Sequence, residues 1–304
     1  MEEKQHMTNE QLKETLRRHR SAVTLFHILT YGFGIAAILL FATGIIPIAI
    51  LCFILALVSS YQFSKRTGDL KKTLSDNVIR NVLNEVFDSA EYNPFDHVPD
   101  KLIKGAGMVF PFTYDCVRGS DRIKAIYKGL NLELSDVELY HVTEWYNEEN
   151  SRWEESEERV FQGQWLVCDF GKRLSGEVRL SENTKSMRKQ HKNNRIEMEN
   201  PAFNDRIVVT AEKAQEAYYV LTPHMMDYIL TAVNGCGGEI YMSFLLDGKL
   251  HIAIKTGRNF FELGKSNTDI ESLRHKFLGE LHWFTDVVDN LRLEDSLYKK
   301  ETNT

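Results

Sequence analysis

The chain has 304 residues, of which 43% are hydrophobic and 26% are charged, and its net charge is −6. The charge is uneven: residues 22–63 contain no Asp, Glu, Lys or Arg, whereas residues 64–304 carry 32 basic against 39 acidic side chains. One long uncharged segment excludes a purely soluble protein, a disordered chain and a polytopic transporter. The negative remainder disfavours nucleic acid as a partner, because phosphate binding requires a positive surface.

Residues 1–21 are expected to form a short cytosolic helix. Thr8 and Gln11 have the spacing of a capping box, in which the two side chains satisfy free N–H groups at the start of a helix. This helix is expected to reach Arg20 and lead into the uncharged segment.

Residues 22–63 are predicted to form a hairpin of two transmembrane helices. One span needs about 20 apolar residues, and Gly44 and Pro47 near the middle of the segment favour a turn. A signal peptide has an apolar core of only about 7–15 residues, and a single helix of about 63 Å would exceed the bilayer. His27 is expected to lie at the membrane interface, close to water.

Basic residues flank the hairpin on both sides, and the turn between the two spans has none. They are Lys13, Arg17, Arg18, Arg20, Lys65, Arg66, Lys71 and Lys72. Because basic residues remain on the cytoplasmic side of a membrane, both termini are predicted to be cytoplasmic. The four cysteines form no CxxC pair and fit a reducing compartment.

Residues 64–90 are predicted to form an amphipathic juxtamembrane helix. Apolar residues recur every four positions and define one stripe, made of Leu70, Leu74, Val78, Val82 and Val86. Two interpretations remain open: the stripe docks onto the protein's own domain, or it forms a self-associating stalk.

Residues 91–293 are expected to form one cytosolic α+β domain, followed by a flexible tail at 294–304. Strands are predicted at 122–127, 130–134, 137–145, 159–161, 164–170, 177–180, 196–198, 207–210, 239–245 and 250–254, with Gly163 as a β-bulge. Helices are predicted at 211–219, 223–235 and 269–291. This order favours a mostly antiparallel sheet with packed helices over a doubly wound sheet.

Several strand and turn segments of this domain resemble a bacterial membrane-anchored family. They are residues 127–136, 160–170, 203–210, 221–226, 240–244 and 250–254. The family is known as a domain of unknown function, number three-one-three-seven. The resemblance implies a two-helix anchor followed by a soluble domain at the bacterial inner (plasma) membrane. It implies no activity and no catalytic residue.

Motifs that would indicate catalysis, a metal or a cofactor are weak, and we expect none of the three. The Gly-Lys-Ser segment 264–266 lacks the earlier glycine of a phosphate-binding loop, because Asn259 occupies that position. His275 and His282 are about 10 Å apart along one predicted helix, too far to share a metal ion. Cys236 has no evident base nearby, and the end of a helix explains its glycine neighbours.

Two oppositely charged segments are candidate contact sites, and both are expected to be loops between strands. Residues 144–158 contain seven acidic side chains, and Trp145 and Trp153 are a candidate protein-recognition tip. The basic segment is a candidate contact for a partner or for anionic lipid head groups, where each base contributes about 1 kcal/mol. Its residues are Lys185, Arg188, Lys189, Lys192 and Arg195. Two solvated hairpin tips without a function are the alternative.

The leading hypothesis is a non-enzymatic module, integral to the lipid bilayer, whose cytosolic domain binds a partner protein or the inner leaflet. A homo-oligomer is compatible with it. One alternative is a membrane-tethered, hydrolase-like enzyme, because catalytic groups far apart in sequence can meet in space. Another is a pleckstrin-like lipid-binding module, because many strands and a final helix fit that shape.

Overall fold

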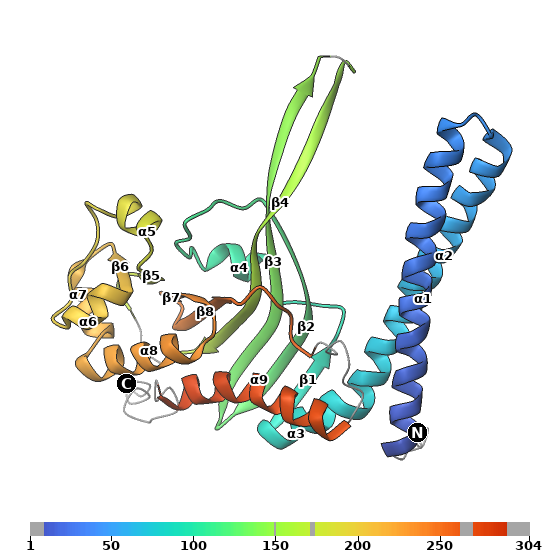
Figure 1. The fold of residues 1–304 in the computed structure, drawn as a ribbon. Coiled ribbons are helices and arrows are strands. Elements are labelled where there is room, and N and C mark those ends of the chain that lie inside the picture. The colour runs from blue at the N-terminus through green and yellow to red at the C-terminus, as the bar shows by residue number, and fades with distance from the viewer. Residues whose placement is uncertain (1–8, 149, 171–173, 262–269, 291–304) are drawn as a thin grey trace. The chain divides into compact units, whose positions relative to one another are not determined.

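The computed structural model describes residues 9–148, 150–170, 174–261 and 270–290 (Figure 1). Internal contacts divide the chain into two compact units, Met1–Val82 with Leu263–Lys276, and Leu83–Glu262 with Phe277–Thr304. The predicted cap at Thr8, the segment 264–266 and the tail 294–304 lie outside the described residues.

The first unit is built on a helical hairpin, as predicted. Helix α1 (Asn9–Ala42) includes the expected N-terminal helix without a break, and α2 (Ile46–Leu74) follows after three residues. Gly44 adopts a φ of 83°, a left-handed conformation that glycine adopts without strain. Pro47 lies in the first turn of α2, where its missing N–H group leaves no helical hydrogen bond unmade.

The hairpin presents its apolar side chains outward. Both helices are long and apolar enough to cross a membrane, and only 6% and 11% of their most apolar windows are buried. Large exposed side chains occur along both of them, including Ile38, Phe41, Phe53 and Leu57. The core helix of a soluble protein would instead bury most of such a window, so this surface is suited to an apolar environment.

Small residues allow the two helices to pack closely. Ala37 on α1 and Ala49 and Ser59 on α2 are buried, as is typical where helices approach each other without a bulky side chain between them. His27 packs its ring against Tyr31 and Phe63, with centroid distances of 4.9 and 5.1 Å. His27, near the start of the uncharged segment, therefore lies beside Phe63, the last residue of that segment.

The predicted juxtamembrane helix continues directly from α2. A single π-helical turn, η1 (Ser75–Ile79), joins α2 to α3 (Arg80–Val86). The predicted stripe is buried at Leu74, Val78 and Val82, and Phe87 packs edge-on against Tyr127. Both interpretations of the stripe, docking and self-association, stay predictions.

The second unit contains one eight-stranded sheet, and its fold is α+β as predicted. The strands are β1 (Ser89–Asn93), β2 (Cys116–Tyr127), β3 (Leu130–Asn147), β4 (Arg152–Asp169), β5 (Val178–Glu182), β6 (Ile207–Ala211), β7 (Glu239–Phe244) and β8 (Lys249–Lys255). Their order is β1-β2-β3-β4-β8-β7-β5-β6, and every neighbouring pair is antiparallel.

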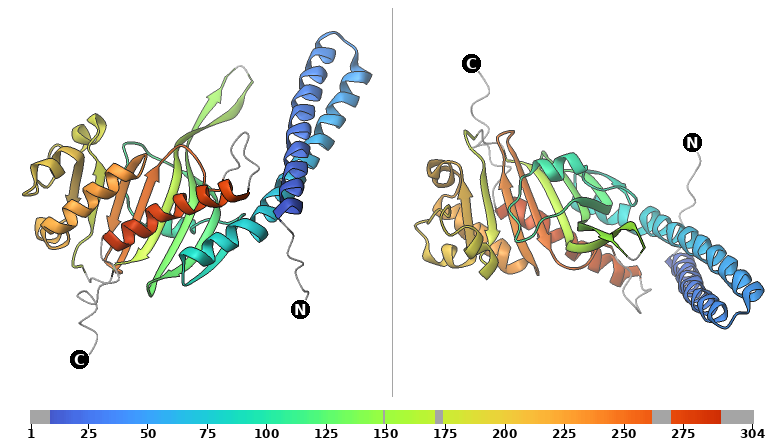
Figure 2. Two further views of the ribbon diagram at one scale, coloured as in Figure 1. Left: turned by 60° about the horizontal axis from the view of Figure 1, so that its bottom comes forward. Right: turned by 90° about the horizontal axis from the view of Figure 1, so that it is seen from above.

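Helices cover both faces of this sheet (Figure 2). On one face, residues of α9 (Ile270–Asn290) contact the segment that follows β8: Phe277 packs on Phe261, and Phe284 packs on Phe260. On the other face, α4 (Asp100–Gly105) and the segment after it cover a core that includes Phe161 and Trp165. The centre of the sheet is therefore buried on both sides.

The remaining helices cluster around β5, β6 and β7. They are α5 (Lys185–Gln190), α6 (Pro201–Arg206), α7 (Ala214–Val220) and α8 (Pro223–Gly235). Helix α8 begins and ends as predicted, because the Thr222 hydroxyl accepts a hydrogen bond from the Met225 N–H and Gly235 is its last residue. The predicted strand at 196–198 is wrong, since only Ile196 bridges to Val209.

The predicted β-bulge at Gly163 is also wrong. The register of β3 and β4 shifts between Leu139 and Tyr140, so the extra residue is Val160. Gly163 has a different role: a Cβ atom there would lie 1.8 Å from the Ile254 carbonyl oxygen. Only glycine lets β8 approach β4 this closely.

Candidate interaction surfaces

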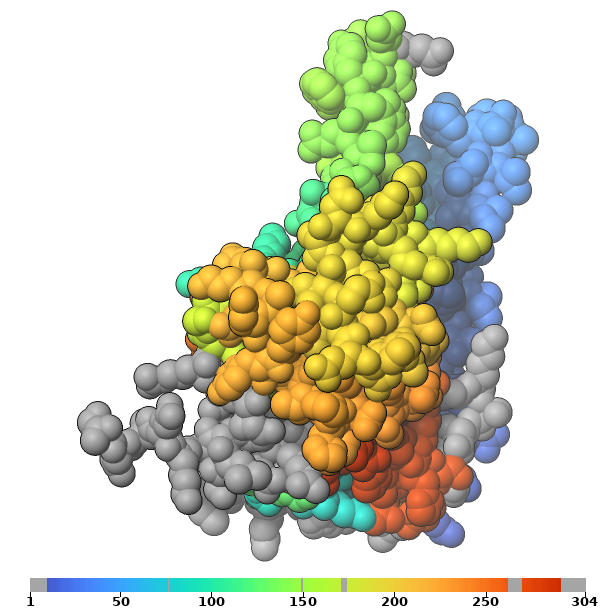
Figure 3. All heavy atoms as spheres, turned by 90° about the vertical axis from the view of Figure 1, so that its left-hand side faces the viewer, coloured from blue at the N-terminus to red at the C-terminus, as the bar shows by residue number. Residues whose placement is uncertain are grey.

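The acidic segment forms most of a two-stranded arm at the outer ends of β3 and β4. Strands β3 and β4 remain paired as far as Asn147 and Arg152, whereas β2 pairs with β3 only to Tyr140. On the other side, β8 pairs only with residues 164–169 of β4. We use "the ribbon" for residues 140–147 and 152–159, which project past the rest of the sheet in Figures 1 and 3. The prediction of a loop is therefore wrong for most of this segment.

The root of the ribbon is fixed to the domain by polar contacts. The Arg118 guanidinium of β2 lies 2.6 Å from the Glu157 carboxylate and 4.5 Å from the centroid of the Tyr140 ring. The Asp115 carboxylate accepts a hydrogen bond of 2.9 Å from the Val142 N–H. These contacts direct the ribbon outward, so its position relative to the sheet is defined although its outer part is solvated.

The two faces of the ribbon differ. Because side chains alternate along a strand, Tyr146 and its cross-strand partner Trp153 share one face, and their rings meet edge-on at a centroid distance of 5.6 Å. Trp145 lies on the opposite face, across from Glu154. The two predicted tip residues, Trp145 and Trp153, are both exposed, by 42% and 71%, but they do not form one surface. Tyr146, 49% exposed, is the partner that sequence reasoning missed.

A pair of acidic residues lies next to the aromatic pair on the same face, one alternation closer to the root of the ribbon. Glu144 and Glu155 are directly opposite each other in the register, and neither forms an ion pair within the described ranges. Like charges directly opposite each other destabilise a strand pair. We call Glu144, Tyr146, Trp153 and Glu155 the acidic strip. It combines exposed aromatic area with uncompensated negative charge.

The basic segment is a short helix, α5, and the prediction of a loop is wrong there too. The Thr184 hydroxyl caps it by accepting a 3.3 Å hydrogen bond from the Met187 N–H, and the buried Met187 side chain attaches the helix to the domain. The exposed side chains Lys185, Arg188 and Lys189 are spaced three and four residues apart and so share one face.

Four of the five predicted basic residues are available for binding. Lys185, Arg188, Lys189 and Lys192 are exposed and have no ion pair among the residues that the structure describes, and we call them the α5 surface. Arg195 differs, because it donates to the Asn204 carbonyl oxygen at 2.8 Å and pairs with Glu197 at 3.1 Å. Its charge serves the local fold and is removed from this surface.

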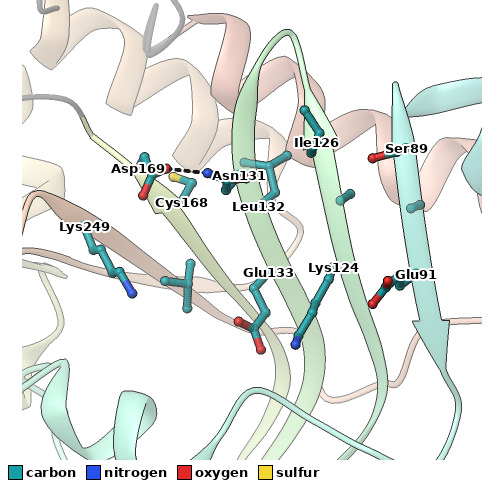
Figure 4. Close-up of a pocket in the computed structure, with 13 residues that line it drawn as sticks. Ser89, Glu91, Lys124, Ile126, Asn131, Leu132, Glu133, Cys168, Asp169 and Lys249 are labelled. Carbon is teal, nitrogen blue, oxygen red and sulfur yellow. Dashed lines mark hydrogen bonds between the residues drawn. The ribbon is translucent and has the colours of Figure 1, made fainter.

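A third candidate is an open hollow of about 490 Å³ on the sheet (Figure 4). Strands β1 to β4 and β8 line it with side chains of both signs, among them Glu91, Lys124, Glu133 and Lys249. Glu133 is already paired with Arg122 at 2.6 Å. Cys168 borders the hollow, but its thiol is buried and burial raises its pKa, which keeps it protonated at neutral pH.

Two buried carboxylates form a network on the face that α9 covers. Asp136 accepts hydrogen bonds from Gln164 at 3.1 Å and from the Phe260 N–H at 2.7 Å, and burial raises its pKa well above its usual value. Tyr92 and Ser120 donate to Asp121, whose backbone is in the left-handed region with a φ of 60°. Both carboxylates are nearly inaccessible to solvent, so they act as links between strands and the 256–261 segment.

His251 is the most deeply buried histidine of the second unit. Its Nδ1 accepts a hydrogen bond of 3.2 Å from Trp165 Nε1, so the neutral ring carries its proton on Nε2. Burial lowers the pKa of His251 to about 4. Neither its Nε2 nor the Ser243 hydroxyl beside it has a hydrogen-bond partner in the described part of the chain. This pair has no access to solvent and cannot reach a substrate from outside.

Comparisons with known proteins match one family model and one solved structure to this chain. Residues 159–293 match a family model described as "Protein of unknown function (DUF3137)", which confirms the resemblance found in the sequence. No curated protein matches significantly. A solved structure, the mycobacterial trehalose monomycolate transport factor A, TtfA, is 12% identical, with 69% of this chain and 90% of that chain covered. Its TM-score of 0.33 establishes no shared fold.

Proposed function

We propose that the protein is an integral membrane module whose α+β domain binds a partner protein on the cytoplasmic side through the ribbon. The ribbon is the observation that carries this proposal. Trp153 and Tyr146 stay exposed at the end of an ordered arm, although aromatic side chains are among the most effective anchors of protein interfaces. An arm that contributed only to folding would not need them there.

Membrane anchoring is supported by the surface of α1 and α2. Their exposed apolar side chains would be costly in water and are accommodated by lipid. Basic residues precede α1's uncharged part and follow that of α2, and this pattern supports a topology with both flanks on the cytoplasmic side of a bacterial inner membrane.

A hydrolase-like enzyme is the less supported alternative. Among the candidate sites built from the described residues, only the open hollow on β1 to β4 and β8 is accessible to a substrate, since His251 and the buried carboxylates are closed to solvent. The described residues that line the hollow include no histidine, and the Cys168 thiol beside it is held in its protonated form. A nucleophile without a base or a lowered pKa is poorly activated.

Site-specific photo-crosslinking in cells tests the proposal. A photoreactive amino acid replaces Trp153 in the full chain, and the same substitution at Phe95, exposed elsewhere on the domain, is the control. We expect a discrete crosslinked product from position 153 in the membrane fraction and none from position 95. The product should weaken when Tyr146→Ala removes the second ring. Equal products at both positions, or a chain that stays soluble after ultracentrifugation, would contradict the proposal.

The α5 surface supports a second candidate, contact with anionic lipid head groups. Four exposed cations that form no ion pair among the described residues can together attract an anionic leaflet. The test is reversal of Arg188, Lys189 and Lys192 to Glu. Under this second candidate the domain loses affinity for vesicles rich in phosphatidylglycerol, whereas unchanged affinity would rule it out.

A further inference from the structure

The acidic strip and the α5 surface are complementary in charge and in spacing. Glu144 and Glu155 face each other across one strand pair, where Cβ atoms are about 4.5–5.5 Å apart. On α5, residues three and four apart, such as Lys185 and Lys189, have Cβ atoms about 5–6 Å apart. One basic face of a helix can therefore place two cations against two carboxylates.

The aromatic pair fits the same kind of partner. A guanidinium or an ammonium group is attracted to the face of Trp or Tyr when it lies within about 6 Å of the ring centre. Trp153 and Tyr146 flank the two carboxylates on the same side of the ribbon. A cation such as that of Arg188 could then contact a ring while its neighbours on the helix pair with Glu144 and Glu155.

Both surfaces belong to the same chain but do not meet within it. Strands β8 and β7 separate β4 from β5, and α5 follows β5. Three strand spacings correspond to about 14 Å across the sheet. The ribbon also leaves the sheet on its own, and Figure 3 shows its outer half extending beyond the domain. Both surfaces consequently remain open to another molecule.

We infer that the acidic strip of one copy binds the α5 surface of a second copy in the same membrane. This inference rests on the proposed function of the ribbon as a binding element and names its partner. The contact joins two different surfaces and is therefore heterologous, so two copies can exchange it reciprocally or extend it into a chain. Anchoring confines the copies to one plane and raises their effective concentration, so a modest contact suffices.

Energy transfer between copies of the full chain tests the inference. Donor-labelled and acceptor-labelled protein is reconstituted together in vesicles of neutral phosphatidylcholine, which removes anionic lipid as a competitor. We expect transfer above that of a diluted sample. It should fall as the salt concentration rises from about 0.05 to about 0.5 M, because exposed charges are screened.

Two charge reversals, tested alone and mixed, give the decisive result. Glu144→Lys with Glu155→Lys reverses the strip, and Arg188→Glu with Lys189→Glu reverses the α5 surface. Each double variant alone should associate at least about 10-fold more weakly, since like charges then oppose each other. A mixture of the two should regain association, because each restores the other's complement. Glu212→Lys with Asp227→Lys, at exposed acids elsewhere, is the control and should behave as the wild type.

The outcomes separate this inference from the proposed function. No transfer in the wild type, or no recovery in the mixture, overturns the inference. If position 153 nevertheless crosslinks to a different protein in cells, the ribbon remains a binding element and only its partner is wrong. If position 153 gives no product and the vesicles show no transfer, both are overturned.

Discussion

The inner and outer halves of strands β3 and β4 share one hydrogen-bonded ladder but have opposite surroundings. In the inner half, Leu139 is buried opposite Phe161, and Trp165 is buried on the same face of β4, two alternations further along the strand. In the outer half, the corresponding cross-strand pairs are Glu144 with Glu155 and Tyr146 with Trp153, all of them exposed. The backbone geometry is continuous, and only the side-chain environment changes.

This difference separates residues that stabilise the fold from residues that are free to bind. Burial on both faces makes the inner half essential, because each large side chain removed there leaves a cavity. The outer half buries little and has opposed like charges, so it contributes little or even costs stability. Its sequence is then explained better by recognition than by folding, a distinction that mutations in the two halves can test.

The largest expected contrast is between Phe161→Ala and Trp153→Ala. Phe161 is fully buried and its ring lies 5.9 Å from that of Phe110, so its truncation should cost about 3–5 kcal/mol. Trp153 contacts Tyr146 on an exposed surface, and its truncation should cost well under about 1 kcal/mol. Thermal unfolding of the full chain in detergent, followed by circular dichroism, measures both. The first variant should lower the midpoint by about 10 °C.

The same pair of variants should reverse its order in a binding assay. Trp153→Ala is expected to lower the energy transfer between copies described above while the fold is retained. If Trp153→Ala instead destabilised the protein as much as Phe161→Ala, the ribbon would be part of the folding core, and the contrast between the two halves would be wrong.

A pH titration of His251 sharpens the account of the inner half. The folded-state pKa is lowered to about 4, whereas the unfolded value is about 6.5. The contribution of His251 to the free energy of unfolding is thus fully present above about pH 6.5. As the pH falls towards 4, the unfolded state binds a proton that the folded state does not, and about 3 kcal/mol of stability is lost in total. His251→Gln should remove this part of the pH dependence of the unfolding free energy, measured by urea denaturation. His224→Gln, at an exposed histidine, is the matched control for the substitution itself.

Much of the architecture was predictable because strong local signals determined it. The uncharged segment with Gly44 and Pro47 predicted the helical hairpin, and Thr222-Pro223 with Gly235 predicted the limits of α8. The alternation of apolar residues predicted most of the strands. Residues 89–93 were missed, because β1 is a short edge strand whose pairing with β2 is a tertiary contact without a local apolar pattern.

The candidate surfaces were predictable in composition but not in form. Seven acidic residues between 144 and 158 suggested a loop, although Val142, Thr143 and Tyr146 have high strand propensity. The one-residue shift at Val160 set which side chains share a face, and no local signal places it. Alternation alone could have shown that Trp145 and Tyr146, as neighbours in a strand, point to opposite sides. Arg195 looked like its basic neighbours because its partner Asn204 lies nine residues further along the chain, in α6.

The smallest expected effect concerns the opposed acids of the outer half. Glu144→Gln keeps the shape of the side chain but removes one of two like charges that face each other, which should stabilise the ribbon by about 0.2–1 kcal/mol. Hydrogen exchange of the ribbon amides should slow by a corresponding factor of about 1.4 to 5. The measurement uses one copy of the chain per nanodisc, so that association does not contribute.

Glu154→Gln is the matched control on the opposite face, and it should have the opposite sign. Glu154 accepts a 2.9 Å hydrogen bond from Asn147 and lies 3.5 Å from Arg152, so removing its charge weakens contacts that the ribbon makes within itself. Faster exchange in Glu154→Gln with slower exchange in Glu144→Gln would show that the strip carries a local electrostatic cost. Equal effects would mean that solvent already screens the Glu144–Glu155 pair, and relief of repulsion would then no longer be a reason for this face to bind a basic helix.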